Sequence, residues 1–501
     1  MFIALECRVM TLLTLLALSS SNAFAQQAAS ASDQEIAGRI DEYMSANVSI
    51  GLSGTLLVAR GENVLLSKGY GFADKQKNIP NTPETVFDIG SNSKQFTAAA
   101  ILKLVDQSKL KLTDTLGSLF DDAAADKKAI TIHQLLTHTS GLQEYSGRDS
   151  ESLSLDSFLE RVFKSELLYA PGEKFEYSNV GYSLLAAIIE RTSGTDYEAF
   201  LAEQLFEPAG MKHTGYLLPD WSGQQLALGY HRGFNEMGTT IARYKQVGVS
   251  WNLMGNGGIN STAEDLYRWF RAVQGGKILS PSSRDLFYAP HAVRNSESRW
   301  RYGYGWLVSE SNRNTRVLAH NGANGVYWSS LYWYPDENVT LIYSSNYDSA
   351  NLNGIAIEVR QLFFDADYQP KTLTPAPYLL VYRFTQEREA KDVARLVEML
   401  ALGTGSPLED RNILNRVGYW HLEQKNYDWA FALYELNIEL FPGDGNLWDS
   451  LGEAYLATNQ NGQALEAFKK ALALAPEEEC FWCDNAREKI LQLEQEGGRI
   501  G

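Results

Sequence analysis

Ser91 and Lys94 stand three residues apart in the string FDIGSNSKQF, at the start of a predicted helix over residues 93–108. Two side chains at this spacing lie on the same face of a helix. A lysine that is held neutral can accept the proton of a serine hydroxyl, and the positive potential at a helix N-terminus stabilises the alkoxide that forms. The pair therefore predicts a nucleophilic serine with a lysine as its base.

Tyr177 and Asn179 form a second polar group in the string Y-S-N, between the turn at Pro171 and Gly172 and an apolar, helix-like run. The sequence predicts that this group lies on a loop leading into a helix, with its side chains directed into a cleft. A tyrosine oxygen in this position can act as a general base or as a proton relay. The asparagine can form hydrogen bonds with both the lysine and a substrate amide.

A third group, His320 to Gly322, follows the β-rich string TRVLA and precedes a short loop before a predicted strand over residues 325–334. Glycine at the edge of a strand allows a ligand to approach the backbone closely. We therefore expect the backbone N–H of Ala323 to form an oxyanion hole together with that of Ser91.

Taken in this order, S-x-x-K, Y-x-N and H-x-G resemble the motifs of the serine β-lactamase and penicillin-binding superfamily. The second motif, Y-x-N rather than S-D-N, is similar to that of the class C branch. Other strings within residues 35–365 also resemble this branch: LLTHTSGL (135–142), EPAGMKHT (207–214), GGINSTAEDL (257–266) and YGYGW (302–306).

The resemblance implies that Ser91 is the acylated nucleophile and that Lys94 activates it. It also implies that Tyr177 assists proton transfer and that Asn179 orients the lysine and the substrate.

The resemblance further implies that His320 and Gly322 line the strand that pairs with the substrate. Class C β-lactamases have a lysine where this chain has His320. This departure favours esterase or peptidase relatives over efficient lactam hydrolysis.

Each of these residues could instead have an ordinary structural role. Ser91 could cap a helix, Tyr177 could pack in the core, and His320 could be a structural histidine. The order of the three motifs favours the chemical interpretation. His138 is predicted to be a structural histidine on a loop that bonds to backbone, and the string G-N-G-G (255–258) is predicted to form a turn because it lacks the lysine of a phosphate loop.

The chain has 501 residues and a formal net charge of −17, which argues against nucleic acid as a partner. Its seven histidines form no metal-binding cluster, so the sequence predicts neither a metal nor another cofactor. Cys480 and Cys483 are predicted to form a local disulfide rather than a redox motif, because no thioredoxin-like βαβ pattern surrounds them.

The N-terminus resembles a secretory signal peptide over residues 1–25. Arg8 precedes an apolar stretch at 9–18, and Ala23 to Ala25 form an A-x-A cleavage site. We therefore expect export to the periplasm or beyond. No later stretch is long and uncharged enough to span a bilayer, so no membrane span is predicted.

Residues 26–365 are predicted to form an α+β domain in which an antiparallel sheet is flanked by helices and joined to an all-α subdomain, as in β-lactamases and transpeptidases. The predicted elements are a helix at 33–46, a hairpin turning at Gly61 and Glu62, a mostly helical middle from 130 to 290, strands at 303–309, 315–320, 325–334 and 339–345, and a helix at 352–364. The site is expected where the sheet meets the helices.

A linker is predicted at 366–384, followed by a tetratricopeptide-type helical domain over 385–501. The repeat signature occurs at Trp448, Leu451, Gly452, Tyr455, Ala464, Phe468 and Pro476, and a degenerate copy occurs 34 residues earlier. Such a tail could bind a protein partner in a groove or could stabilise the catalytic domain, and the sequence leaves both roles open.

The sequence therefore predicts an exported serine hydrolase that acts on a small-molecule or peptide substrate through a covalent acyl-enzyme. The bond cleaved would be an ester or amide, with D-amino-acid peptides among the candidates. One alternative is a penicillin-binding sensor or scaffold that is acylated but turns over slowly. Another is a true class C-like β-lactamase.

Overall fold

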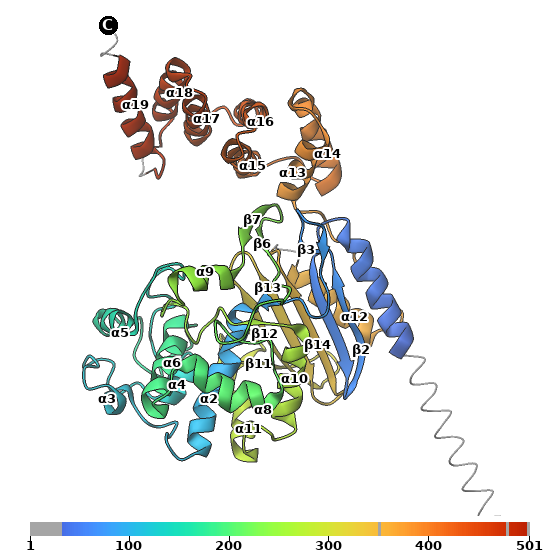
Figure 1. Cartoon of the computed structure of the whole chain (residues 1–501), viewed down its shortest axis with the longest axis vertical. Coiled ribbons are helices and arrows are strands. Elements are labelled where there is room, and N and C mark those ends of the chain that lie inside the picture. Colours follow the sequence, from blue (N-terminus) through green and yellow to red (C-terminus); the bar gives the residue numbers. More distant parts are fainter. Residues whose placement is uncertain (1–32, 349–351, 477–479, 498–501) are drawn as a thin grey trace, which may run out of the picture. The chain divides into compact units, whose positions relative to one another are not determined.

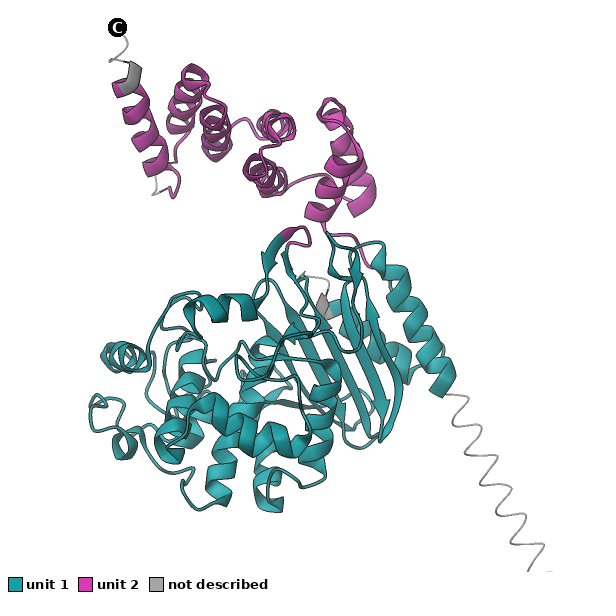
Figure 2. Ribbon diagram, viewed as in Figure 1, with its two compact units in different colours: residues 1–231, 236–372 teal, residues 232–235, 373–501 magenta. Residues whose placement is uncertain are grey.

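The computed structural model describes residues 33–348, 352–476 and 480–497. These residues form two compact units (Figure 2). The first unit contains the described residues up to His231 together with Glu236–Thr372, and the second contains Arg232–Asn235 together with the described residues from Leu373 onwards. The predicted signal peptide, 1–25, lies outside the described residues.

An eight-stranded antiparallel sheet is the frame of the first unit (Figure 1), with the strand order β2-β1-β14-β13-β12-β11-β10-β9. The strands are β1 Gly54–Arg60, β2 Asn63–Tyr70, β9 Ala292–Val293, β10 Arg301–Tyr302, β11 Leu307–Glu310, β12 Arg316–Ala323, β13 Trp328–Tyr334 and β14 Val339–Ser345. The predicted hairpin is confirmed, because β1 and β2 pair up to Arg60 and Asn63 around the turn at 61–62. The sheet joins the two ends of the unit by pairing β1 with β14.

The last strands differ in detail from the prediction. The expected strand at 303–309 is interrupted by a turn, in which the N–H of Gly303 donates to the carbonyl of Trp306 at 2.6 Å. Strand β12 continues to Ala323 rather than ending at residue 320, so the H-N-G motif lies inside the strand. Three short two-stranded pairings complete the unit: β3 Phe72–Asp74 with β4 Ile79–Pro80, β5 Phe87–Asp88 with β8 Asn260–Ser261, and β6 Gly229–His231 with β7 Asn235–Gly238.

The two faces of the sheet are both covered, as the alternation of side chains along a strand predicts. On one face, Leu57, Ile342 and Leu331 belong to the large core cluster that also contains residues of α10 (Ala263–Gln274). On the opposite face, aromatic residues of α12 (Leu352–Phe364) contact the strands. The ring of Phe364, for example, lies 4.8 Å from that of Tyr334.

The helical part contains the elements that carry the candidate site. A 3₁₀ turn, η1 (Gly90–Ser93), leads into α2 (Lys94–Asp106), and α2 packs against α6 (Asn179–Ser193). Every residue from 94 to 102 is buried, so α2 lies in the middle of the core rather than on its surface. The other helices are α3 Leu116–Leu119, α4 Ile132–Leu136, α5 Leu155–Lys164, α7 Tyr197–Leu201, α8 Glu207–Ala209, α9 Thr240–Val247 and α11 Pro281–Phe287.

The second unit is helical and begins earlier than predicted. Its elements are α13 Pro377–Glu387, η3 Ala390–Arg395, α14 Leu396–Thr404, α15 Asn412–Glu423, α16 Tyr427–Leu440, α17 Gly445–Ala457, α18 Asn461–Ala473 and α19 Cys483–Gly497. The linker predicted at 366–384 is therefore too long, because α13 begins at Pro377. Pro377 occupies the first turn of α13, where the fixed φ of proline favours helix formation, although in sequence the same proline suggested a linker.

The repeat period is visible in the packing of the helix pairs α15–α16 and α17–α18. A side chain added at Gly418 would meet the ring of Tyr434 at 2.8 Å, and one added at Gly452, 34 residues later, would meet the ring of Phe468 at 2.7 Å. In both copies of the repeat, a glycine therefore stands where the paired helices approach closely.

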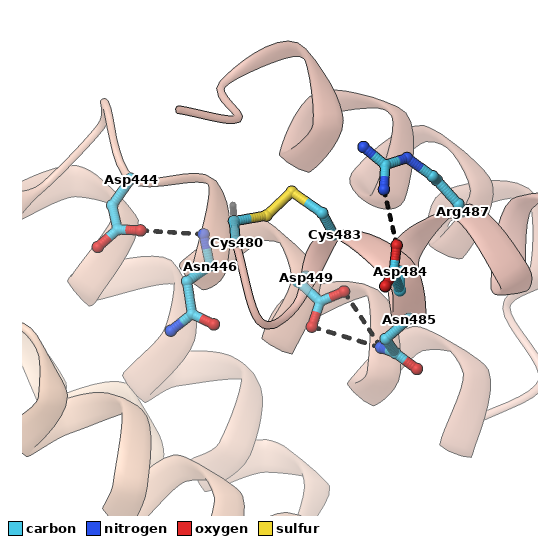
Figure 3. Close-up of a disulfide and its surroundings, with 8 residues drawn as sticks. All are labelled: Asp444, Asn446, Asp449, Cys480, Cys483, Asp484, Asn485 and Arg487. Atoms are coloured by element: carbon cyan, nitrogen blue, oxygen red, sulfur yellow. Dashed lines mark hydrogen bonds and ion pairs between the residues drawn. A yellow bond between two sulfur atoms is a disulfide. The ribbon is translucent and has the colours of Figure 1, made fainter. Parts of the chain in front are cut away.

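The core of the second unit includes a loop from an earlier part of the chain. Phe234 is only 7% exposed, and its ring stacks on that of Tyr382 with centroids 5.1 Å apart. At the other end of this unit, Cys480 and Cys483 form the predicted disulfide at the start of α19 (Figure 3). Of the helices that the structure describes, none is long and apolar enough to cross a membrane.

Candidate active site

Ser91 lies in the 3₁₀ turn η1, directly before α2. The turn is pressed against β12, and two glycines make this possible. Gly90 has a φ of +52°, a region that favours glycine, and a side chain there would meet the backbone nitrogen of Ala323 at 2.7 Å. A side chain at Gly322 would meet the carbonyl oxygen of Ile89 at 2.0 Å and the nitrogen of Ser91 at 2.6 Å. The backbone N–H groups of Ser91 and Ala323 therefore belong to two segments in direct contact.

Lys94 is fully buried, and its Nζ has three hydrogen-bond partners. Nζ lies 3.0 Å from Ser91 Oγ, 2.6 Å from Asn179 Oδ1 and 2.7 Å from the carbonyl oxygen of Asn256. The predicted serine–lysine–asparagine group is thus brought together from η1, α2 and α6.

The environment of Lys94 favours its neutral form. Burial lowers the pKa of its ammonium group to about 7, although the negative charges of Asp149 and Glu144 act in the opposite direction. A large fraction of the lysine is therefore uncharged near neutral pH.

Tyr177 lies beside this pair, with its ring centroid 4.9 Å from Lys94 Nζ. Burial raises the pKa of the Tyr177 hydroxyl, while its hydrogen bond with Ser91 acts against the shift. The phenol therefore keeps its proton near neutral pH, which favours a proton relay over a tyrosinate base.

The loop that carries Tyr177 is held by His138. The backbone N–H of Ser178 donates to His138 Nδ1 at 3.0 Å, and the imidazole ring lies 4.3 Å from the ring of Tyr177. Ser178 in turn caps α6, because its Oγ accepts from the N–H of Gly181 at 3.0 Å. The predicted backbone bond of His138 is confirmed, and it fixes the loop from which the second motif projects.

His320 is buried inside β12 and does not carry a positive charge. Its Nε2 lies 3.2 Å from the hydroxyl of Tyr302, and its Nδ1 donates to the carbonyl of Asn321 at 2.8 Å. Burial lowers the pKa of His320 to about 3, and the charge of Lys94 adds to the effect. The histidine is therefore neutral at physiological pH.

These groups border a cleft of about 520 Å³ in the first unit. Ser91, Tyr177, Asn179, His320 and Ala323 line it, whereas Lys94 and Gly322 lie behind its surface. Acidic and basic side chains both face the cleft, among them Glu144, Asp149, Arg243 and Arg294.

Several residues of this cleft were not found from the sequence. Asn256 belongs to the G-N-G-G string, which was predicted only as a turn. It contributes a backbone carbonyl, a group that cannot be recognised from residue type. Arg243 and Arg294 come from α9 and from the segment after β9, far from the three motifs. Asp88 also lines the cleft and was missed, although it stands only three residues before Ser91 in the first motif's string. Within the described ranges, no three His, Cys, Asp or Glu side chains gather as metal ligands would.

An antiparallel sheet flanked by helices, with a serine–lysine pair at the start of a buried helix, is the arrangement of penicillin-binding-like serine hydrolases. The chain belongs to the Beta-lactamase family, whose family model matches residues 36–362. A model of the tetratricopeptide repeat matches residues 445–478.

Curated relatives and solved structures agree with this assignment. Penicillin-binding protein 4* of Bacillus subtilis is 30% identical over 309 residues, which cover 59% of this chain and 68% of the relative. The putative penicillin-binding protein PbpX of the same organism is 28% identical over 324 residues, covering 65% and 78%. The crystal structure of a penicillin binding protein from Bacillus halodurans has a TM-score of 0.55 and 27% identity, covering 63% of this chain and 98% of that one. EstCE1, described as a hydrolase with promiscuous acyltransferase activity, shares the fold at 23% identity and a TM-score of 0.57, covering 66% and 99%.

Proposed function

We propose that this chain is an exported serine hydrolase that cleaves an ester or amide through an acyl-enzyme on Ser91. The observation that carries the proposal is the contact of 3.0 Å between Lys94 Nζ and Ser91 Oγ, made by a lysine whose pKa is about 7. A neutral amine at this distance is a suitable general base for the serine hydroxyl.

The hydrogen bonds of Lys94 also support this direction of proton transfer. Two of its three partners, Asn179 Oδ1 and the carbonyl of Asn256, can only accept. A neutral amine has two N–H groups and one lone pair. Donation to these two acceptors leaves the lone pair for the proton of Ser91.

In the proposed reaction, Ser91 Oγ attacks the substrate carbonyl while its proton passes to Lys94. The oxyanion accepts hydrogen bonds from the N–H groups of Ser91 and Ala323. The proton reaches the leaving group through the Tyr177 hydroxyl, and water then releases the acyl group by the same relay in reverse.

Because His320 is neutral, β12 offers no permanent cation at this position. The site should therefore favour esters and uncharged amides over substrates that need a positive charge on this strand. This argues against the alternative of a true class C-like β-lactamase. Because two relatives are named penicillin-binding proteins, a lactam is an appropriate test compound, and D-amino-acid peptides belong in the substrate panel.

The proposal is tested by labelling the full-length protein with a fluorophosphonate and by measuring p-nitrophenyl ester hydrolysis. We expect Ser91→Ala to abolish labelling and to lower turnover at least about a thousandfold. Ser157→Ala, an exposed serine of α5, is the matched control and should behave like the wild type. Labelling of Ser91→Ala at the wild-type rate would exclude Ser91 as the nucleophile.

The same ester assay separates the hydrolase from a slowly deacylating sensor. A hydrolase gives continued product release, whereas a sensor gives one equivalent of product followed by a stable acyl-enzyme. Export is tested separately, because cleavage after Ala25 would leave a mature protein that begins at Gln26.

A further inference from the structure

Asp88 is a buried carboxylate that lines the cleft, and the reaction proposed above gives it no role. It ends the short strand β5, is only 2% exposed and lies two residues before Gly90. Strand β5 is held in place by its pairing with β8 and by the bond from the N–H of Ile89 to the carbonyl of Ile259 at 2.9 Å. The position of this carboxylate is therefore fixed by the core.

The two oxygens of Asp88 bind two different segments of the cleft. Oδ1 accepts from the N–H of Gly90 at 2.8 Å, and Oδ2 accepts from Asn324 Nδ2 at 3.0 Å. Asn324 uses its own Oδ1 to accept from the N–H groups of Val326 at 3.1 Å and Tyr327 at 2.8 Å. One carboxylate thus connects the turn before Ser91 to the turn that follows β12.

These two segments carry the two N–H groups assigned to the oxyanion hole. Gly90 directly precedes Ser91, and Asn324 directly follows Ala323. We propose that Asp88 is the positioning residue that fixes the Ser91 and Ala323 amides relative to each other, an inference that rests on the proposed function. A displacement of about 1 Å at such a site is enough to lower a rate by about a hundredfold.

Both oxygens of Asp88 must act as acceptors, because the N–H of Gly90 and the NH₂ group of Asn324 are donors. Burial raises the pKa of Asp88 to about 6, while the bond from Gly90 and the charge of Arg243 on α9 act against this shift. Asp149, in the loop before α5, adds a smaller repulsion. At pH 7.5 the group is therefore mainly ionised, and both of its oxygens are free to accept.

An exchange of the two side chains tests this arrangement in the full-length protein. Asp88→Asn keeps an acceptor for Gly90 but directs an NH₂ group at the NH₂ group of Asn324. Asn324→Asp alone places two carboxylates at the same contact. The double variant restores one donor facing one acceptor, and its new carboxylate at position 324 can still accept from the N–H groups of Val326 and Tyr327.

For ester hydrolysis at pH 7.5, we expect Asp88→Asn and Asn324→Asp each to lower kcat by about ten- to a hundredfold, with KM changed by less than about threefold. The double variant should recover kcat to within about fivefold of the wild type. Asn324→Ala, which removes the bond to Asp88 together with the acceptor for the N–H groups of Val326 and Tyr327, should lower kcat by about tenfold.

Asp265→Asn is the matched structural control. Asp265 is fully buried in the same unit and accepts from the N–H of His213 at 2.7 Å, but it does not line the cleft. This variant should lower the thermal midpoint and leave kcat unchanged.

The positioning role is wrong if Asp88→Asn and Asn324→Ala keep the wild-type kcat, or if the double variant is no better than the single ones. Should Asp88→Asn fail to fold, Asn324→Ala and the double variant still decide the question. Fluorophosphonate labelling of the wild type distinguishes failure of the proposed function from failure of the positioning role. If Ser91 is not labelled, the proposed function fails, whereas normal labelling with unaffected Asp88 and Asn324 variants excludes only the positioning role.

Discussion

Lys94 shows how burial changes the protonation of a single side chain. An ammonium group inside an apolar helix loses hydration, so the neutral amine becomes the stable form at a much lower pH than in water. The contacts with Asn179 and Asn256 then orient the amine toward Ser91.

The first prediction concerns pH. A base with a pKa of about 7 is inactive when protonated, so kcat/KM for a neutral ester should rise with pH through about 7 and level off above about 8. Lys94→Arg should lower kcat at least about a hundredfold, because the guanidinium stays protonated. Lys103→Arg, on the same helix, is the control and should keep the profile. A rate that falls between pH 6 and 8 would contradict the assignment of Lys94 as the base.

The second prediction concerns the relay. Tyr177→Phe removes the hydroxyl but keeps the ring that contacts His138, so it should lower kcat by about a hundredfold with little change in KM. Combined with Lys94→Ala, the losses should be much less than multiplicative, since the two groups act as a unit. Tyr304→Phe is the control, because its hydroxyl bonds His133 outside the cleft. Losses that multiply fully would show that the two groups do not share a proton path.

At the scale of the elements, the decisive feature is the direct contact between η1 and β12. The third prediction is that Gly322→Ala lowers kcat at least about a hundredfold, because the added methyl group would meet the Ile89 carbonyl and the Ser91 nitrogen. Gly38→Ala introduces the same methyl group where no atom lies within 4 Å, and it should leave kcat unchanged. Wild-type turnover by Gly322→Ala would mean that the two segments can separate without affecting the reaction.

The sequence predicted what local pattern controls. The hairpin of β1 and β2, the strands predicted at 325–334 and 339–345 and the helix predicted from the apolar run of α2 agree with the structure within a few residues. The turn at Gly303 was missed, because the aromatic residues of the string YGYGW (302–306) favour a strand, whereas its glycines allow the local turn that joins β10 to β11. Pro377 was assigned to a linker because a proline at the first turn of a helix and a proline in a linker look alike in sequence.

The candidate site was predictable where side chains carry the chemistry. Ser91, Lys94, Tyr177 and Asn179 were identified by residue type and spacing, and the structure places them within one group of contacts. The carbonyl of Asn256 could not be identified, because every residue has one. The uncharged state of His320 also depends on burial, which only the fold determines.

At the scale of the whole molecule, the two units differ in what they can do alone. All site residues belong to the first unit, so a chain ending at Thr372 should still be labelled at Ser91 and hydrolyse small esters. The same truncation removes Tyr382 and the other core partners of Phe234. A large apolar side chain left in water costs about 1.5–3 kcal/mol and promotes association.

The fourth prediction is therefore that the truncated chain is active but poorly soluble, and that Phe234→Ser added to it restores solubility without changing kcat. Soluble yield, thermal midpoint and ester turnover measure the outcome. In the full-length protein, Phe234→Ser should weaken the second unit and leave labelling of Ser91 unchanged. A truncated chain that is fully soluble without the substitution would show that an uncovered Phe234 does not drive association.

The composition of the second unit, with one loop taken from residues 232–235, has a consequence for how such proteins arise and how they are made. A tail of this kind cannot be transferred to another enzyme by one recombination event, because the recipient would also need a suitable loop in the middle of its own sequence. During synthesis, this loop leaves the ribosome long before the helices that bury Phe234. The first unit must therefore present the loop until residues 378–436, which carry the core partners of Phe234, have been synthesised.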